Sequence, residues 1–273
     1  MKMLVNGKQG DTVAVMNRGF QYGDGLFETI EIRQNTPIFF ERHLQRLDTD
    51  SQRLHLLKLD LDLICAEAKQ LYENAGNAVL KIIITRGIGG RGYRQPDEIQ
   101  PTRILSLHPF PDYSQSYYDD GIVARICNTR LGLNPSLAGM KHLNRLEQVL
   151  ARAEWNDNAI HEGIMLDFNE RVIEGTMTNL FYAKNGELFT AKLSLCGIAG
   201  ILRGWIFEQI NVIEHDFYLE NLHQADEIFV CNSVMGICGV QQIENHIFKI
   251  GEITKNLQIT LENEKQKQVA LCN

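Results

Sequence analysis

The sequence predicts an α+β protein in which β-hairpins and helices alternate irregularly along the chain. Two Asn-Gly pairs, at residues 6–7 and 185–186, follow segments of strand character and predict tight hairpin turns. Apolar residues recur at helical spacing elsewhere, as at Leu44, Leu47 and Leu54. Hairpins mixed with helices do not suit a doubly wound parallel sheet, so the sequence favours α+β over that class.

The first half of the chain contains both element types. Residues 26–32 alternate, which places Phe27 and Thr29 on one face of a strand and Glu28 and Ile30 on the other. In chain order we expect strands at 3–5 and 26–32, helices at 41–57 and 60–75, and strands at 78–85 and 103–110.

A linker separates the two halves in this interpretation. Residues 111–121 (PDYSQSYYDDG) are polar and aromatic and lack periodicity, so we expect one domain over 1–115 and a second over 116–273. The second half is expected to hold strands at 121–127, 163–168, 171–182, 187–191, 212–217 and 227–232, and helices from 145 to about 160 and at 201–210, 219–224 and 251–266.

Composition indicates a soluble globular protein. The chain has 273 residues, 44% of them hydrophobic and 22% charged, which suits two domains of modest size. A net charge of −7 argues against a nucleic-acid partner or an anionic membrane. The first ten residues do not read as a signal peptide, and the longest apolar run, 228–240, is too short to span a bilayer. We therefore expect a cytoplasmic protein.

Cysteine and histidine patterns exclude two further classes of site. The six cysteines form no CxxC pair, so they are expected to be reduced thiols. A catalytic role for Cys196 or Cys231 stays an alternative, although no histidine pattern accompanies either. The eight histidines form no HxH or HExxH array, so no metal site is predicted.

The segment GMKHLNRLEQ, residues 139–148, places Lys141 on a glycine-containing turn before a helix. Asn144 and Glu147 are spaced as in a capping box. A lysine held there and partly desolvated has a lowered pKa, and its neutral amine can form a Schiff base. The alternative is an exposed lysine at a helix start. The residues at helical spacing, expected to form a buried face, are Leu146, Val149, Leu150 and Ala153.

Residues 85–93 (TRGIGGRGY) contain a GxGxxG pattern after a predicted strand. A dinucleotide site would need a helix to follow, because the phosphate binds at the N-terminus of that helix. Pro96 and Pro101 follow instead, so we interpret the segment as a loop that presents Arg91 and Tyr93. The arginine would bind a carboxylate through two hydrogen bonds or remain solvated.

Three other features are compatible with a phosphate or ring-nitrogen site. His43 and Arg46 lie three apart on a predicted helix, either on a solvated face or beside a bound phosphate. Two glycines in residues 197–203 precede a helix and would leave backbone N–H groups for an anion, or form an ordinary loop. Glu174 is either an exposed strand-end carboxylate or a buried one that needs a cationic partner.

Taken in order, Arg46, Lys141, Glu174 and residues 197–203 give a chain that resembles the fold-type IV pyridoxal-phosphate enzymes. This family includes D-amino-acid aminotransferases, branched-chain aminotransferases and aminodeoxychorismate lyase. GGRGY at 89–93 and AGMKHLNRLEQVLAR at 138–152 are most similar to the last of these, and YGDG at 22–25 also belongs to the family pattern. The resemblance implies a two-domain fold like that of D-amino-acid aminotransferase, with the active site between the domains.

The resemblance also implies roles in binding pyridoxal 5′-phosphate. Lys141 would form the covalent bond to the cofactor, and Glu174 would pair with the protonated pyridine nitrogen, keeping the ring an electron sink. The phosphate would be bound by Arg46, the backbone of Ile201 and Leu202, and Ser233, with Asn232 beside them.

On the substrate side, Arg91 and Tyr93 match positions that bind a substrate carboxylate in D-amino-acid aminotransferases. They would reach the neighbouring subunit's site, because family members are typically homodimers. Those aminotransferases carry tyrosine where Phe27 stands, and Phe27 cannot donate a hydrogen bond, which disfavours transamination. Thr29 shares the face of Phe27, so its hydroxyl would meet the substrate and assist proton transfer.

The implied activity is a lyase reaction that converts 4-amino-4-deoxychorismate to 4-aminobenzoate and pyruvate, a step toward folate. The nearest alternative is an aminotransferase for D-amino or branched-chain amino acids. A protein that only carries or senses the cofactor is a third possibility of a different class.

Overall fold

A computed structural model describes residues 2–272 and divides the chain into two units. Unit 1 comprises Met1–Pro111, Lys141–Asn144 and Lys265–Asn273, and unit 2 comprises Asp112–Met140 and Arg145–Glu264. The sequence-based boundary assigned Lys141 and the C-terminal segment to the second domain, whereas the structure groups both with unit 1. The mixture of helices with largely antiparallel sheets confirms the α+β class.

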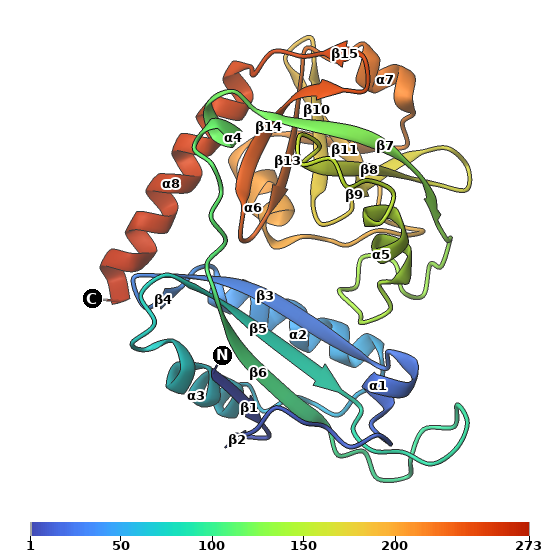
Figure 1. The fold of residues 1–273 in the computed structure, drawn as a ribbon, viewed down its shortest axis with the longest axis vertical. Helices are drawn as coiled ribbons and strands as arrows, with labels where there is room; N and C mark the ends of the chain where they lie inside the picture. The colour runs from blue at the N-terminus through green and yellow to red at the C-terminus, as the bar shows by residue number, and fades with distance from the viewer. Residues whose placement is uncertain (1, 273) are drawn as a thin grey trace. The chain divides into compact units, whose positions relative to one another are not determined.

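Unit 1 is built on a six-stranded sheet in the order β2-β1-β6-β5-β3-β4, and every pairing in it is antiparallel (Figure 1). A hairpin at Asn6-Gly7 joins the first two strands, as predicted, with both residues at positive φ. The strands are β1 (Lys2–Val5), β2 (Lys8–Gln9), β3 (Gly25–Arg33), β4 (Thr36–Pro37), β5 (Ala78–Thr85) and β6 (Thr102–Pro109).

Two helices cover one face of this sheet, and a single apolar core lies between them and the strands. Even-numbered residues of β3, such as Leu26 and Ile30, join that core together with Leu47 and Ile64 from the helices. Phe27 and Thr29 therefore lie on the opposite face, as the alternation predicted. The helices of unit 1 are α1 (Arg18–Tyr22), α2 (Phe40–Arg53) and α3 (Leu61–Tyr72); α1 was not expected from the sequence.

Unit 2 contains a nine-stranded sheet, most of which closes on itself. The strand order runs β12-β11-β10-β13-β14-β7-β8-β9, and β9 pairs again with β10 through Glu174 and Asn179. Six strands thus form a ring. The strands are β7 (Ile122–Leu131), β8 (Glu162–Asp167), β9 (Val172–Gly175), β10 (Asn179–Lys184), β11 (Glu187–Ala191), β12 (Val212–His215), β13 (Glu227–Asn232), β14 (Gly236–Ile243) and β15 (His246–Ile247), which pairs with β14.

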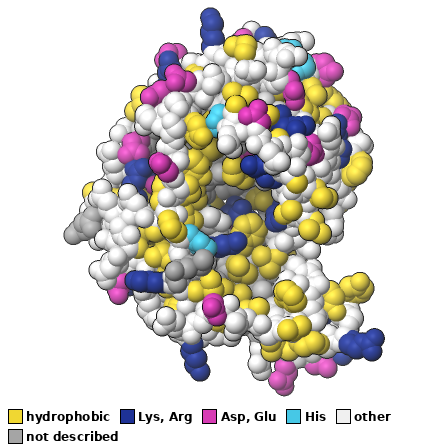
Figure 2. Space-filling view, viewed as in Figure 1, with side chains coloured by type: hydrophobic (Ala, Val, Ile, Leu, Met, Phe, Trp, Pro, Cys, Tyr) yellow, Lys and Arg dark blue, Asp and Glu magenta, His cyan; other side chains and the backbone are white. Residues whose placement is uncertain are grey.

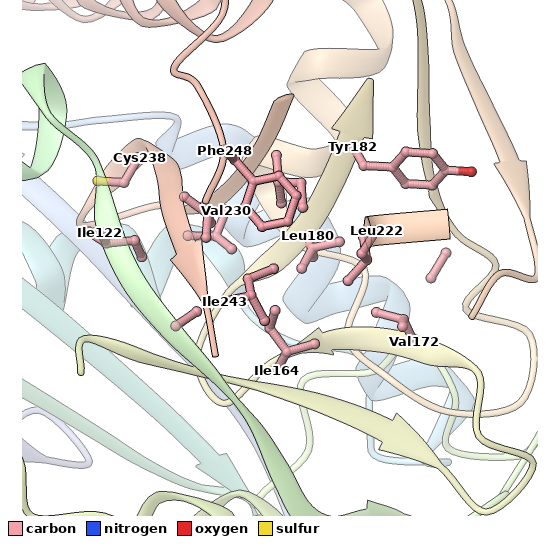
Figure 3. Close-up of a cluster of buried hydrophobic side chains, with 14 of the residues drawn as sticks. Ile122, Ile164, Val172, Leu180, Tyr182, Leu222, Val230, Cys238, Ile243 and Phe248 are labelled. Carbon is pink, nitrogen blue, oxygen red and sulfur yellow. The ribbon is translucent and has the colours of Figure 1, made fainter. Parts of the chain in front are cut away.

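Apolar side chains from these strands meet in one buried cluster. Figure 3 shows Ile164, Leu180 and Val230 converging from three strands, with Leu222 from a helix beside them. Each of these four side chains is fully buried. Because each strand contributes alternate residues to this cluster, the register of the ring is set by burial.

Helices complete unit 2, and α6 packs against β13. They are α4 (Ser116–Asp119), α5 (Leu146–Arg152), α6 (Ile201–Gln209), α7 (Leu219–His223) and α8 (Glu252–Cys272), which continues into unit 1. The sequence did not predict α4, which falls in the expected linker, or strand β14.

The predicted strand at 171–182 is interrupted. Residues 176–178 form a turn between β9 and β10, because the buried Glu162 carboxylate accepts hydrogen bonds from the Thr176 N–H (3.0 Å) and from the hydroxyls of Thr176 (2.6 Å) and Thr178 (2.8 Å). Periodicity could not indicate this break, since Glu162 lies 14 residues before Thr176. The Asn185-Gly186 hairpin that follows β10 is confirmed.

The expectations for helix α5 were wrong in three respects. The helix ends at Arg152 instead of near residue 160. No capping box forms: the Asn144 side chain donates to the Gly23 carbonyl (3.2 Å), and Glu147 accepts the Gly132 N–H (2.8 Å). The apolar stripe faces outward, and the exposed fractions are 75% for Leu146, 60% for Val149 and 61% for Leu150.

The surface carries charges of both signs. On the face shown in Figure 2, acidic and basic side chains are interspersed with apolar ones, and no large basic region gathers there. Among residues 2–272, no helix combines the length and apolar character that crossing a bilayer demands.

A buried carboxylate holds the start of α8, and its removal provides a stability test. Glu227 accepts the N–H groups of Ile253 (3.2 Å) and Thr254 (2.9 Å) and the Thr254 hydroxyl (2.6 Å). Because hydrogen bonds to charged groups contribute roughly 1.5–3 kcal/mol each, Glu227→Ala should lower the free energy of unfolding by about 2–4 kcal/mol in urea titrations. Glu252→Ala, at an exposed position of the same helix start, should cost less than about 1 kcal/mol. Equal losses in the two variants would contradict this role of Glu227.

Candidate active site

Lys141 is held against unit 1 by backbone pairing with β3. The Phe27 N–H donates to the Lys141 carbonyl, and the Leu143 N–H donates to the Gly25 carbonyl, each at 3.0 Å. A side chain at position 25 would place its Cβ 2.4 Å from the Ile84 carbonyl oxygen, so this glycine of YGDG permits the close approach of the strands. The backbone before and after Lys141 is therefore fixed.

Lys141 makes two further contacts, one through its backbone N–H and one through its ammonium group. Asp50 accepts the Lys141 backbone N–H at 3.1 Å, and the Lys141 ammonium lies 4.3 Å from the centroid of the Phe27 ring. Burial raises the pKa of Asp50, although the Lys141 N–H and the charge of Arg46 act in the opposite direction. Lys141 is thus half-buried on an aromatic face, not a freely solvated lysine at a helix start.

A buried carboxylate organises the neighbouring part of α2. Glu28 accepts hydrogen bonds from Arg46 Nε (2.7 Å) and Nη2 (2.5 Å), and its Oε2 lies 2.6 Å from His43 Nδ1. Burial alone would raise the pKa of Glu28, but the charge of Arg46 and the hydrogen bonds from His43 and Arg46 lower it to about 2. His43 and Arg46 do not form a solvated helix face, since their exposed fractions are 0% and 11%.

His43 keeps one polar atom available. Burial lowers the pKa of His43, and within the described residues its Nε2 has no hydrogen-bond partner. With Nδ1 directed at the Glu28 carboxylate, the neutral ring carries its proton on Nδ1 and a lone pair on Nε2. This buried, unpartnered nitrogen lies on the same helix as Arg46 and is suited to a polar ligand group.

The loop that carries Arg91 and Tyr93 is tied to the YGDG segment. Arg18 donates to the backbone carbonyls of Gly92 (3.1 Å) and Tyr93 (3.3 Å), and its Nε donates to Asp24 (2.8 Å). Burial acts to raise the pKa of Asp24, but hydrogen bonds from Arg86 and Arg18 lower it. No helix follows the glycines of this loop, and the next element is β6, as the two prolines predicted. Tyr93 itself is 85% exposed.

Unit 2 gathers the other predicted residues around the segment 197–200. Glu174 Oε2 accepts the Ile198 N–H at 2.8 Å. Asn179 holds both ends of the same turn, donating to the Ile198 carbonyl (2.8 Å) and accepting the Gly200 N–H (3.1 Å). Gly139 also pairs with it, because its N–H donates to Gly197 and its carbonyl accepts from Ala199, each at 2.9 Å. Gly139 lies two residues before Lys141.

This segment leads into an uncapped helix. Gly200 is the N-cap of α6 and, having no side chain, makes no side-chain cap bond to the first turn, where the backbone N–H groups of Ile201 and Leu202 lie. Such N–H groups and the helix dipole favour an anion. At the end of β13, Asn232 accepts the N–H groups of Val234 (3.0 Å) and Met235 (2.7 Å) and so shapes the turn that carries Ser233.

Several residues that contribute to these clusters were not identified from the sequence. Asp50 and Glu28 act through tertiary contacts with Lys141 and Arg46, for which no spacing rule exists. Arg145 is half-buried: desolvation lowers its pKa, and the carboxylates of Glu174 and Glu147 oppose that shift. Burial raises the pKa of Cys231 and Cys196 to about 12, which removes them as candidate nucleophiles.

The Glu28 cluster predicts a specific response to acid. Because its folded pKa of about 2 lies below its ordinary value of 4.5, ionised Glu28 stabilises the fold above pH 4.5, and this contribution is lost as pH falls toward 2. Glu28→Gln should therefore lower the free energy of unfolding by roughly 3–5 kcal/mol at pH 7, since Arg46 loses its buried partner. The difference from the unaltered protein should shrink between pH 4.5 and 3, measured by urea unfolding. A difference independent of pH, or one matched by the exposed Glu98→Gln, would contradict the assignment.

Comparison with known proteins identifies the family of this chain. The chain is 36% identical over 263 residues to the aminodeoxychorismate lyase of Vibrio harveyi, covering 93% of this chain and 97% of that protein. It is 30% identical to a putative branched-chain-amino-acid aminotransferase of Methanocaldococcus jannaschii, covering 94% of each. The crystal structure of 4-amino-4-deoxychorismate lyase from Pseudomonas aeruginosa superposes with a TM-score of 0.92 at 42% identity, covering 96% of this chain and 98% of that one. The family model described as amino-transferase class IV matches residues 25–243, and this chain belongs to that family.

Proposed function

We propose that this protein is a pyridoxal-phosphate-dependent lyase that converts 4-amino-4-deoxychorismate to 4-aminobenzoate and pyruvate, in the cytoplasm and as a step toward folate. The observation that carries the proposal is the placement of Lys141, whose ammonium lies on the Phe27 ring while Asp50 and β3 hold its backbone. The similarity to the Vibrio harveyi and Pseudomonas aeruginosa lyases over almost the whole chain supports the choice of reaction.

The residues present fit pyridoxal phosphate. The uncapped N–H groups of Ile201 and Leu202, the Ser233 hydroxyl, which Asn232 positions, and Arg46 supply the donors that a phosphate needs. Glu174 is 3% exposed and supplies a buried carboxylate for a protonated ring nitrogen. Lys141 supplies the amine that bonds the cofactor aldehyde. Each group that this cofactor requires is therefore present in the chain.

The chemistry divides between cofactor and protein. When bound, pyridoxal phosphate withdraws electrons from the carbon that bears the substrate amine, and Glu174 keeps the ring nitrogen protonated for this purpose. Lys141, in its neutral form, removes the proton from that carbon, and loss of the enolpyruvyl ether then leaves the aromatic ring. Lys141 returns a proton to the enolpyruvate, which becomes pyruvate. Thr29, on the face of Phe27, would assist proton transfer.

Phe27 favours the lyase over an aminotransferase. Its ring lies under the Lys141 ammonium but cannot donate a hydrogen bond to a substrate carboxylate. Arg91 and Tyr93, on the loop that Arg18 holds, would bind a substrate carboxylate in the neighbouring subunit. The proposal therefore includes a homodimer.

The outward face of α5 supports that homodimer. Leu146, Val149 and Leu150 are each at least 60% exposed and lie on one side of the helix. Monomeric proteins rarely expose contiguous apolar patches, because such patches favour association. A second copy of the chain would remove these side chains from water.

The reaction is tested with 4-amino-4-deoxychorismate generated in situ, following release of 4-aminobenzoate and pyruvate. Lys141→Ala should lower the rate at least about 10³-fold, because both the covalent attachment and the proton transfers are lost. The visible absorbance of the bound cofactor should change in the same variant. Lys58→Ala, at an exposed position away from Lys141, serves as the control and should keep full activity. Normal pyruvate release by Lys141→Ala would overturn the mechanism.

The same preparation separates the rival functions. An aminotransferase would lose its visible cofactor band when an amino acid alone is added, since the first half-reaction needs no second substrate. A carrier or sensor of the cofactor would show the band but turn over neither substrate. A protein that gains no visible band on addition of pyridoxal phosphate would exclude all three functions.

The homodimer predicts a specific effect at α5. Leu150→Asp should shift the mass measured by sedimentation from two chains to one, because it places a charge in the apolar stripe. The matched control is Ile259→Asp on α8, since Leu150 and Ile259 are both 61% exposed. That control should leave the mass at two chains. A single-chain mass for the unaltered protein, or a dimer that survives Leu150→Asp, would refute this interface.

A further inference from the structure

A row of polar side chains crosses the Phe27 face of the unit 1 sheet. Thr29 on β3 lies directly opposite Lys81 on β5, and Lys81 lies directly opposite Ser106 on β6. Residues directly opposite on antiparallel strands project from the same face. The three side chains therefore form a short polar row across three neighbouring strands.

An apolar row runs beside it. Phe27 lies opposite Ile83, which lies opposite Ile104, in the same strands and on the same face. The Lys81 ammonium is 5.4 Å from the centroid of the Phe27 ring, and the Lys141 ammonium is 4.3 Å from the same centroid. Two ammonium groups thus meet one aromatic ring at the border between the apolar and the polar row.

Within residues 2–272, Lys81 is a half-buried cation of unit 1 without a counter-ion, whereas the unit's unpaired lysines at positions 2, 8, 58 and 69 are exposed to water. Within the part of the chain that the structure describes, no ion pair or hydrogen bond of its ammonium is present, although the side chain is half-buried. Glu31, two positions beyond Thr29 on the same face, is already paired with Lys265 (2.6 Å) and Arg33 (3.0 Å). The cations of unit 1 that do contact carboxylates include Arg18, Arg46, Arg86, Arg103 and Lys265.

An unpaired ammonium on a half-buried sheet face is costly unless a bound anion accompanies it. The strand around it, AVLKIIIT, is apolar except for Thr85, and Leu80, Ile82 and Ile84 join the core on the opposite face. Its neighbour Thr29 carries a hydroxyl group on the same face, whereas the Ser106 hydroxyl lies 2.9 Å from His108 Nε2. The apolar row beside them can receive a flat carbon ring.

We propose that Lys81 binds the ring carboxylate of the substrate, with the ring on the row of Phe27 and Ile83 and the amine directed to Lys141. This inference rests on the proposed function and deepens it. The chemical class recognised is a six-membered unsaturated or aromatic ring with an amine at one end and a carboxylate at the other. Lys81 is then a residue for substrate binding and specificity, distinct from Arg91 and Tyr93.

The test compares two small probes on the cofactor-loaded protein, measured by calorimetry. 4-Aminobenzoate carries the carboxylate, and aniline is the same ring and amine without it. Lys81→Gln should weaken binding of 4-aminobenzoate roughly 10- to 100-fold, because a charge-assisted hydrogen bond is lost, and should leave aniline binding unchanged. Lys81→Arg should retain binding to within about threefold, since the charge remains.

Lys69→Gln is the matched control, because Lys69 is exposed on α3, on the side of the sheet away from Phe27. It should bind both probes as the unaltered protein does. Unchanged affinity of Lys81→Gln for 4-aminobenzoate would overturn the proposal. An equal loss for both probes would also overturn it, since it would show a general structural effect.

Turnover gives a second readout that separates this inference from the proposed function. With 4-amino-4-deoxychorismate, Lys81→Gln should raise KM about 10- to 100-fold while kcat changes less than about threefold and the visible cofactor band stays as it was. If the unaltered protein releases no 4-aminobenzoate, the lyase function fails, but the comparison of the two probes still decides whether Lys81 binds a ring carboxylate. A fall in kcat with unchanged KM would contradict a binding role.

Discussion

The pairing of Glu174 with Asn179 is the contact on which unit 2 depends. It joins β9 to β10 and closes the ring of six strands. The same two side chains hold the segment 197–200, through the Ile198 N–H and carbonyl and the Gly200 N–H. The β9–β10 pairing therefore positions both Glu174, the carboxylate proposed to bind the cofactor's ring nitrogen, and the start of α6, which is proposed to bind the phosphate.

In unit 1 the corresponding constraint comes from α2. His43, Arg46 and Asp50 lie on one side of this helix, and each is buried or nearly so. Two of them contact Glu28, while Asp50 holds the Lys141 backbone. A single helix therefore connects the carboxylate of β3 to the lysine proposed to react. Burial is tolerated there because each charge has an opposite charge or an N–H group beside it.

Two helices show the same physical limit of sequence patterns. Periodicity identifies which residues share a face, but not which face is covered. On α2 the pattern left a solvated face and a binding face open for His43 and Arg46, and the structure buries both against Glu28. On α5 the apolar face was expected to be buried and is exposed at Leu150. The segments that bury a helix face are distant in sequence or belong to other chains, so a local sequence pattern does not indicate them.

The sequence by itself determined the features that arise from neighbouring residues. The Asn-Gly hairpins, the alternation that places Phe27 and Thr29 together, and the absence of a helix after Gly92 all follow from local backbone geometry. Only the tertiary structure decided that Asp50 contacts Lys141 and that Thr29 lies opposite Lys81. Asp50 and Lys141 are 91 positions apart in the chain, and Thr29 and Lys81 are 52 positions apart. Both contacts form because strand register and burial are set by the whole sheet.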